Sequence, residues 1–162
     1  MSESDNLSIC RTETGYLVRI APRGTVQESP AVRDFVCRAL EEGIDIVLDL
    51  SACEYLDSTF LGCLVIMHQC GCDSSGSVAV FADEPVRRRL FRTCQLEVLL
   101  SFAALCPPCV SQLVDLQTTN LDRAALCEHL LATHRKLAEL GGPDAEAFRR
   151  IARQLANELN EL

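Results

Sequence analysis

The sequence predicts an α/β fold in which a mixed β-sheet is backed by helices and followed by a C-terminal helical hairpin. Over residues 1–103, apolar runs of strand length alternate with segments of helical periodicity. Residues 44–50 are apolar on both faces apart from two aspartates, which is typical of a central, covered strand. Residues 119–162 carry helical periodicity alone. We therefore expect a domain over 1–103, a connector over 104–118 and a hairpin over 119–162.

The first half of the predicted domain contains a β-hairpin, a helix and the central strand. Residues 7–11 and 16–21 flank the turn-like sequence TETG, which predicts two antiparallel strands. After a loop, apolar residues recur at steps of three and four from Ala31, and Gly43 is placed to end this helix. The central strand at 44–50 follows directly.

The second half of the domain alternates helices with two further strands. A helix is predicted over 58–70, and glycine and serine residues mark the loop after it. Residues 78–81 form a short apolar strand, and Pro85 stands in the first turn of a helix expected over 84–93. Residues 98–102 complete the predicted sheet as its last strand.

The C-terminal segment is predicted to form two helices joined by the turn GGPD. Thr119 or Asn120 is the expected cap of the first helix, which ends near Leu140. Asp122 completes a capping-box spacing, and Asp144 is the expected cap of the second helix. The second helix carries an apolar stripe formed by Phe148, Ile151, Leu155, Leu159 and Leu162. This stripe is buried against the first helix, the sheet domain or a second subunit, and the last case would give a homodimer.

Composition and charge exclude several function classes. Of the 162 residues 48% are hydrophobic, and the net charge of −8 argues against a nucleic-acid partner. The basic stretch from Arg87 to Arg92 is expected to be a solvated helix face. The longest uncharged run, residues 98–114, is broken by Pro107 and Pro108, so no membrane span is predicted. Residues 1–15 lack an apolar signal region, so we expect a cytoplasmic protein.

The ten cysteines are expected to be mostly small buried hydrophobic residues in a reducing compartment. Cys37, Cys63 and Cys94 fall on apolar positions of predicted helices. Cys106 and Cys109 form a C-x-x-C spacing, but the pair follows the last strand, and a structural zinc site needs about four ligands. These two are weak candidates for a metal or redox site, and no cofactor is expected.

Asp57, Ser58 and Thr59 open the helix after the central strand. Such residues commonly cap helices, but in parallel α/β folds binding and chemistry also gather where strands end and helices begin. A hydroxyl at this place, on Ser58 or Thr59, is a candidate nucleophile, phosphate acceptor or binding contact. A nucleophile needs a base, and His68 lies roughly 15 Å along the helix at about 1.5 Å per residue, while the other histidines are in the tail. With no G-x-S-x-G sequence either, a modifiable or binding hydroxyl is favoured.

The stretch IDIVLDLSACEYLDSTFLG, the helix after it and the segment SVAVFADEPVRRRLFRTCQLEVLL resemble a STAS domain of the anti-sigma factor antagonist family. The resemblance covers roughly residues 5–103 in element order and spacing. The family pattern is a buried strand ending in an Asp-Leu-Ser-like step, then Asp-Ser-Ser/Thr/Ala-Gly-x-Gly. Phe60 stands where the family has its first glycine, whereas Leu61 and Gly62 fit. A large apolar side chain at this point could reshape the partner surface.

The resemblance implies a phosphorylation switch in a protein that is not itself an enzyme. A partner kinase, which is an anti-sigma factor with an ATP site of the histidine-kinase type, would phosphorylate Ser58, with Thr59 as the second choice. A phosphatase would reverse the mark. The expected partner-binding residues are Glu54, Tyr55, Asp57, Thr59 and Phe60. Asp49 and Ser51 either shape the same surface or make ordinary turn hydrogen bonds.

Two other functions stay open at this point. Many STAS-like modules are fixed adaptor subunits of larger assemblies and turn over no phosphate, and the helical hairpin favours an added docking or dimerisation role. A small-molecule or nucleotide-binding module is less favoured, because the sequence has no glycine-rich phosphate loop.

Overall fold

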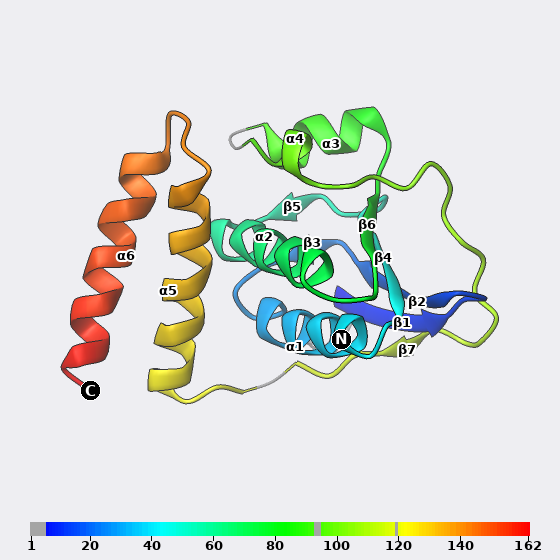
Figure 1. Ribbon diagram of the computed structural model, residues 1–162, viewed down its shortest axis with the longest axis horizontal. Coiled ribbons are helices and arrows are strands. Elements are labelled where there is room, and N and C mark those ends of the chain that lie inside the picture. Colours follow the sequence, from blue (N-terminus) through cyan, green and yellow to red (C-terminus); the bar gives the residue numbers. More distant parts are fainter. Residues whose placement is uncertain (1–5, 93–94, 119) are drawn as a thin grey trace.

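The computed structural model describes residues 6–92, 95–118 and 120–162. In chain order its elements are β1 (Leu7–Arg11), β2 (Gly15–Ile20), β3 (Arg23–Gly24), α1 (Ser29–Glu41), β4 (Asp45–Asp49), β5 (Tyr55–Leu56), α2 (Ser58–Cys72), β6 (Val78–Phe81), α3 (Glu84–Phe91), α4 (Leu96–Leu99), β7 (Val114–Asp115), α5 (Arg123–Glu139) and α6 (Ala145–Asn160). Figure 1 shows their arrangement. The strands and helices expected from β1 to α3 are all present, with ends shifted by a few residues at most.

The main sheet has the strand order β6-β4-β2-β1-β7. β2, β4 and β6 are parallel to one another, while β1 is antiparallel to both β2 and β7. The prediction of a mixed sheet backed by helices is therefore confirmed. A separate parallel pair, β3 and β5, lies in the chain that leads into α2. This pair fixes the segment from which the first turn of α2 starts.

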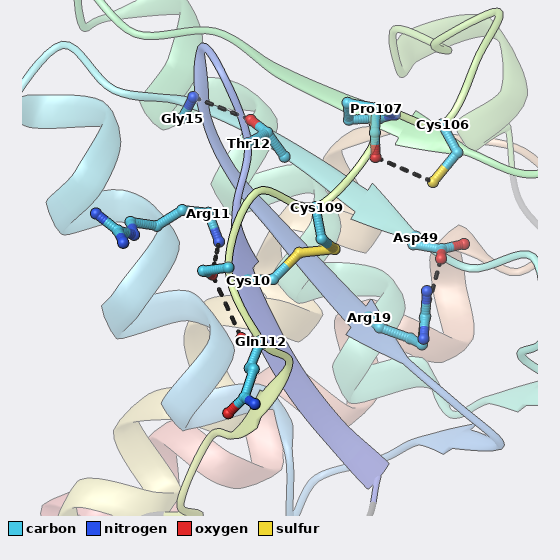
Figure 2. The surroundings of a disulfide bond; sticks show 11 residues. Cys10, Arg11, Thr12, Gly15, Arg19, Asp49, Cys106, Pro107, Cys109 and Gln112 are labelled. Carbon is cyan, nitrogen blue, oxygen red and sulfur yellow. Dashed lines mark hydrogen bonds and ion pairs between the residues drawn. A yellow bond between two sulfur atoms is a disulfide. The ribbon is translucent and has the colours of Figure 1, made fainter.

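Alternation along the strands separates two faces of the main sheet. One face packs against α1 and α2 and forms the aliphatic core; its strand residues include Leu7, Val18, Ile20, Ile46, Leu48 and Val80. The connector lies across the other face, over β1 and β2, where Cys10 is joined to Cys109 (Figure 2). The sheet is thus covered by helices on one side and by extended chain on the other.

α5 and α6 form the predicted helical hairpin, with α5 between α6 and the sheet domain (Figure 1). α5 lies across the ends at which α1 and α2 begin. Leu137 of α5 is 1% exposed and joins the main core, and Phe148 of α6 packs against that core while partly buried. The apolar stripe is therefore buried in part against α5 and in part against the sheet domain. Ile151 and Leu162 remain exposed.

The predicted last strand, residues 98–102, is wrong. α4 occupies the start of this segment, and the remainder makes a single parallel bridge to β6. The reason lies in the spacing of the buried side chains, because Leu96 and Leu100 are buried four residues apart while Val98 is 90% exposed. The fifth strand of the sheet comes instead from the connector, as β7.

The caps of the C-terminal helices also differ from expectation. Asn120 does not cap α5; Asp122 does, since it directly precedes the helix and accepts a hydrogen bond from Ala125 N at 2.8 Å. Thr119, the other expected cap, lies outside the described residues. Asp144 stands at the capping position of α6, but its side chain makes no capping hydrogen bond within the described chain.

Two expectations drawn from composition concern the surface. The arginine-rich face of α3 is not fully solvated, because the Arg87 guanidinium lies 4.7 Å from the centre of the Phe102 ring and Arg89 donates to Cys53 O at 2.8 Å.

Within the described ranges, no helix combines the length and the apolar character needed to cross a bilayer.

Candidate functional site

Asp57 caps α2 and fixes the chain beside Ser58. Its Oδ1 accepts a hydrogen bond from Phe60 N and its Oδ2 accepts one from Val26 N, both at 2.8 Å. The first bond satisfies a free N–H of the helix start, and the second ties that start to the loop before α1. Asp57 therefore holds the backbone from which the Ser58 side chain projects.

A second carboxylate, that of Glu28, lies near this cap and makes the helix start acidic. Glu28 is 1% exposed, and its Oε1 accepts from both Thr25 N and Thr25 Oγ1 at 3.1 Å. Burial raises the pKa of Glu28; the Thr25 bonds oppose this shift, and the charge of Asp57 adds to it. Any negative charge added at the start of α2 would meet these two carboxyl groups.

Ser58, the first residue of α2, meets His134 of α5, with 3.2 Å between Ser58 Oγ and His134 Nε2. His134 Nδ1 lies 2.8 Å from Leu130 O. Since a carbonyl only accepts, Nδ1 carries the proton, and in the neutral ring Nε2 accepts from the Ser58 hydroxyl. The expectation that no histidine reaches Ser58 is therefore wrong. The fold supplies one from 76 residues further along the chain.

A similar contact joins α5 to the start of α1, but with the proton on the other nitrogen. Ser29, the first residue of α1, has its Oγ 2.7 Å from His129 Nε2. The Arg33 guanidinium lies 3.3 Å from His129 Nδ1 and can only donate, so Nε2–H donates to Ser29. Burial, followed by the charges of Arg33 and His134, lowers the pKa of His129 to about 4. Ser29 is thus an acceptor, whereas Ser58 is a donor to a base.

Gly62 allows α5 to approach α2 closely. A Cβ at position 62 would lie 2.3 Å from Thr133 O and 2.7 Å from the carbonyl carbon of the same residue. These are backbone atoms, so no side-chain movement would relieve the contact. α5 therefore covers α2 over one full turn, from Ser58 to Gly62.

Thr59 and Phe60, which were expected at the partner surface, are buried, at 5% and 0% exposure. The Phe60 ring turns into the core because Gly24 of β3 leaves room for it. A Cβ at position 24 would lie 2.9 Å from Phe60 Cδ2 and 2.7 Å from Leu56 Cδ2. The Phe60 side chain is thus accommodated inside the domain, and the expectation that it could reshape the partner surface is wrong.

Glu54 and Tyr55 are exposed, as a partner-binding role requires. Tyr55 is 47% exposed, and the Arg23 guanidinium lies 5.1 Å from the centre of its ring. Both residues belong to the chain that enters α2, so they border the same helix start as Asp57.

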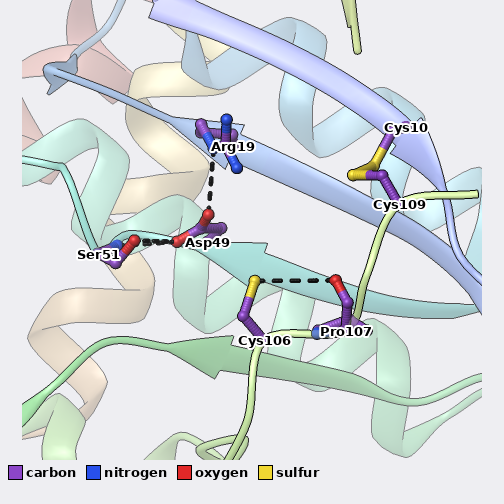
Figure 3. Close-up of polar contacts among 7 residues, drawn as sticks. All are labelled: Cys10, Arg19, Asp49, Ser51, Cys106, Pro107 and Cys109. Carbon is purple, nitrogen blue, oxygen red and sulfur yellow. Dashed lines mark hydrogen bonds and ion pairs between the residues drawn. A yellow bond between two sulfur atoms is a disulfide. The ribbon is translucent and has the colours of Figure 1, made fainter. Parts of the chain in front are cut away.

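Asp49 and Ser51 make turn hydrogen bonds, one of the two alternatives expected for them. Asp49 Oδ1 accepts from Ser51 N at 3.0 Å and from Ser51 Oγ at 2.6 Å. Asp49 Oδ2 pairs with Arg19 Nε at 3.1 Å (Figure 3). With Asp49 only 3% exposed, this group ties the end of β4 to β2.

Cys10 and Cys109 form a disulfide across 99 residues, which the sequence reasoning did not predict (Figures 2 and 3). The C-x-x-C pair therefore does not offer two thiolates for a metal. Cys106 is half-buried near Asp49 and Arg19, and burial raises its pKa. Across the part of the chain that the structure describes, no three His, Cys, Asp or Glu side chains converge as a metal site would require.

The remaining cysteines fit the expectation of buried, unreactive thiols only in part. Cys53, Cys63 and Cys127 are buried, and burial raises the pKa of Cys63 to about 12. Cys72, in contrast, is exposed. Cys94 lies outside the described residues.

A mixed sheet of this order, with helices on one face and a C-terminal helical pair, agrees with the STAS-like fold expected from the sequence. A solved structure with the same fold is an anti-sigma factor antagonist from Mycobacterium paratuberculosis. The two chains are 19% identical with a TM-score of 0.52, over 64% of this chain and 90% of that chain. No protein-family model and no curated protein matches the sequence. The likeness establishes the fold, and more than a third of this chain has no counterpart in that structure.

Proposed function

We propose that this protein is a regulatory binding protein of the anti-sigma factor antagonist type, whose docking to a partner is switched by phosphorylation of Ser58. The observation that carries the proposal is the placement of Ser58 as the half-buried first residue of α2, beside the Asp57 cap. A helix start offers free N–H groups and a positive dipole end, which together favour a bound phosphate. The likeness in fold to an anti-sigma factor antagonist supports a role of the same kind.

The charge of the phosphate would supply the switch. A phosphoserine adds about −1.5 to −2 charges at pH 7. At position 58 this charge stands next to Asp57 and near Glu28, in a chain whose net charge is already −8. It would repel an acidic partner surface and would be costly to desolvate in a close interface. Thr59, the second choice for the phosphosite, is less accessible because it is 5% exposed.

The proposed partners are an anti-sigma factor that is also a serine kinase of the histidine-kinase-like ATPase type, and a phosphatase that removes the mark. Glu54, Tyr55 and Asp57 border the docking surface. The chain itself performs no catalysis in this proposal and acts in the cytoplasm. The proposed division is a STAS-like domain over 1–103, a connector over 104–118 and a hairpin over 119–162.

A second candidate function is that of a fixed adaptor subunit in a larger assembly. One observation favours it: a series of apolar side chains on α4 and the connector is 42–90% exposed. These residues are Val98, Leu105, Val110, Leu113 and Val114. An adaptor that docks through them would bind its partner regardless of what happens at Ser58.

The test is phosphosite mapping by mass spectrometry on the protein from its own cells, combined with pull-downs of Ser58→Asp and Ser58→Ala. We expect phosphate on Ser58, loss of an ATP-binding kinase from the Ser58→Asp pull-down and its retention by Ser58→Ala. Ser75→Asp is the matched control, because Ser75 is exposed just beyond the other end of α2. Equal capture of the kinase by all three variants would rule out the switch and favour the adaptor.

A further inference from the structure

We propose that the α5–α6 hairpin is a removable cover over the start of α2, and that a partner must displace it to reach Ser58. This inference rests on the function proposed above and describes how the same site is regulated. α5 of the hairpin lies against the first residue of α2, where a kinase would have to reach the Ser58 hydroxyl.

The cover engages both helix starts that carry a serine. His134 accepts from Ser58 and His129 donates to Ser29, so one helix holds the first residues of α1 and α2 together. Between these contacts, Gly62 brings the α2 backbone against Thr133 O. α5 is therefore fitted to this face by hydrogen bonds and by close backbone approach.

Occupation of Ser58 by the hairpin and by a kinase is mutually exclusive. Phosphoryl transfer requires the Ser58 oxygen to approach a phosphorus atom in line with the bond that breaks. In the covered state, His134 Nε2 lies 3.2 Å from that oxygen and accepts a hydrogen bond from the Ser58 hydroxyl. A phosphoryl group on Ser58 Oγ would replace the hydrogen that the hydroxyl donates to His134 Nε2, so this contact of the hairpin would be lost. The covered state thus protects Ser58 from modification as well as from docking.

The hairpin is built so that it can leave as a unit. α5 and α6 pack along each other, and Cys127 Sγ lies 3.3 Å from Leu155 O, so the pair keeps its own contacts when it moves. The connector is held to β1 by the Cys10–Cys109 disulfide and by the pairing of β7 with β1. The last of these attachments is at Leu116, whose N donates to Leu7 O at 3.1 Å. Displacement of the hairpin therefore leaves the sheet and its last strand in place.

The first part of the test measures access to position 58 in the full chain. Ser58→Cys supplies a thiol, and its reaction with a bulky polyethylene glycol maleimide is followed by peptide mass spectrometry, which separates it from the other cysteines. Adding Gly62→Ala should raise the labelling rate about tenfold or more, because a Cβ there meets Thr133 O at 2.3 Å and shifts the hairpin equilibrium. Gly71→Ala is the matched control: it makes the same change at the other end of α2, where the nearest atom is Val78 Cγ1 at 3.1 Å.

Equal labelling rates in the Gly62→Ala and Gly71→Ala backgrounds would overturn the proposal. If Gly62→Ala does not fold, Leu137→Ala replaces it, since Leu137 anchors the hairpin from the hairpin's own side and leaves every residue of the sheet domain unchanged. Leu159→Ala, far along α6, is its control and should label at the parent rate. A parent rate in Leu137→Ala would equally refute the cover.

The second part separates the cover from the proposed function. The chain with native Ser58 is incubated with ATP and an extract of its own cells, and phosphate on Ser58 is quantified. We expect faster phosphorylation in Gly62→Ala than in Gly71→Ala. Faster labelling with equal, measurable phosphorylation of Gly62→Ala and Gly71→Ala would show that the kinase reaches Ser58 without displacing the hairpin; this result would overturn the proposal and leave the switch standing. Faster labelling with no phosphate on Ser58 in any variant would support the cover and refute the proposed function.

Discussion

Removing the disulfide between Cys10 and Cys109 should destabilise the protein strongly. The bond closes a loop of 99 residues, and the chain-entropy relation for a loop of this size gives about 4.7 kcal/mol at 25 °C. The double variant Cys10→Ser/Cys109→Ser should lose a large part of this free energy of unfolding. If the free energy of unfolding falls by about 2 kcal/mol per M of urea, the midpoint of unfolding should fall by roughly 2 M urea.

The assay is equilibrium unfolding in urea, followed by circular dichroism under oxidising conditions and repeated with a thiol reductant. The reduced parent protein should match the double variant, because both lack the same bond. Cys72→Ser, at an exposed free thiol, is the control and should change the free energy of unfolding by less than about 0.5 kcal/mol. Coincident unfolding of the oxidised parent and the double variant would refute the argument. Because disulfides are rare in a reducing cytoplasm, the redox state of this pair in cells also tests the proposed location.

Three further predictions concern the site and its surroundings. Lowering the pH should loosen α5, because the pKa of His129 is about 4 in the folded protein against 6.5 in the unfolded chain. The unfolded chain then binds the proton first, so the free energy of unfolding falls as the pH drops from about 6.5 to 4. Amide hydrogen exchange in α5 should become faster over this pH range, and His129→Gln should make the exchange rate less dependent on pH. Gly24→Ala should cost about 1–3 kcal/mol through overpacking against Phe60, and a thermal midpoint equal to that of the parent would contradict the buried placement of that ring. Asp57→Ala should lower the free energy of unfolding by about 2–3 kcal/mol, because it removes a helix cap and the hydrogen-bond partner of Val26 N. Asp83→Ala removes a helix cap alone and should cost about 1 kcal/mol. Equal losses of stability in urea unfolding would show that the Val26 hydrogen bond contributes nothing.

The elements that the sequence predicted well are those with a local cause. Asp57 sits before an apolar helical run, and its capping bond to Phe60 N needs only nearby residues. Gly43 ends α1 with a φ of 81°, a conformation that favours glycine. The central strand β4 was evident from its apolar run between two turns. In each case the determining contacts lie within a few residues of chain.

The contacts that the sequence could not reveal join residues far apart. Ser58 and His134 are 76 positions apart, and Cys10 and Cys109 are 99 apart. Periodicity places a histidine on a helix but does not say which helix it will meet. A weak signal existed in Gly62, since a glycine inside an apolar helix often marks a close approach of another backbone. The burial of Phe60 likewise depended on the gap at Gly24, whose significance appears only when β3 and β5 are paired.

The two histidines of α5 have a thermodynamic consequence for the molecule as a whole. His129 and His134 stand on the same helix, so if the hairpin leaves as one unit, as proposed above, the contact at Ser29 and the contact at Ser58 are lost in the same step. Linkage then requires reciprocity: whatever weakens the first contact by a given free energy favours exposure of Ser58 by the same amount, and a phosphate on Ser58 weakens the grip on α1 in return. A ligand that bound at the start of α1 and weakened the contact between Ser29 and His129 would therefore favour exposure of Ser58 without any change in the sheet.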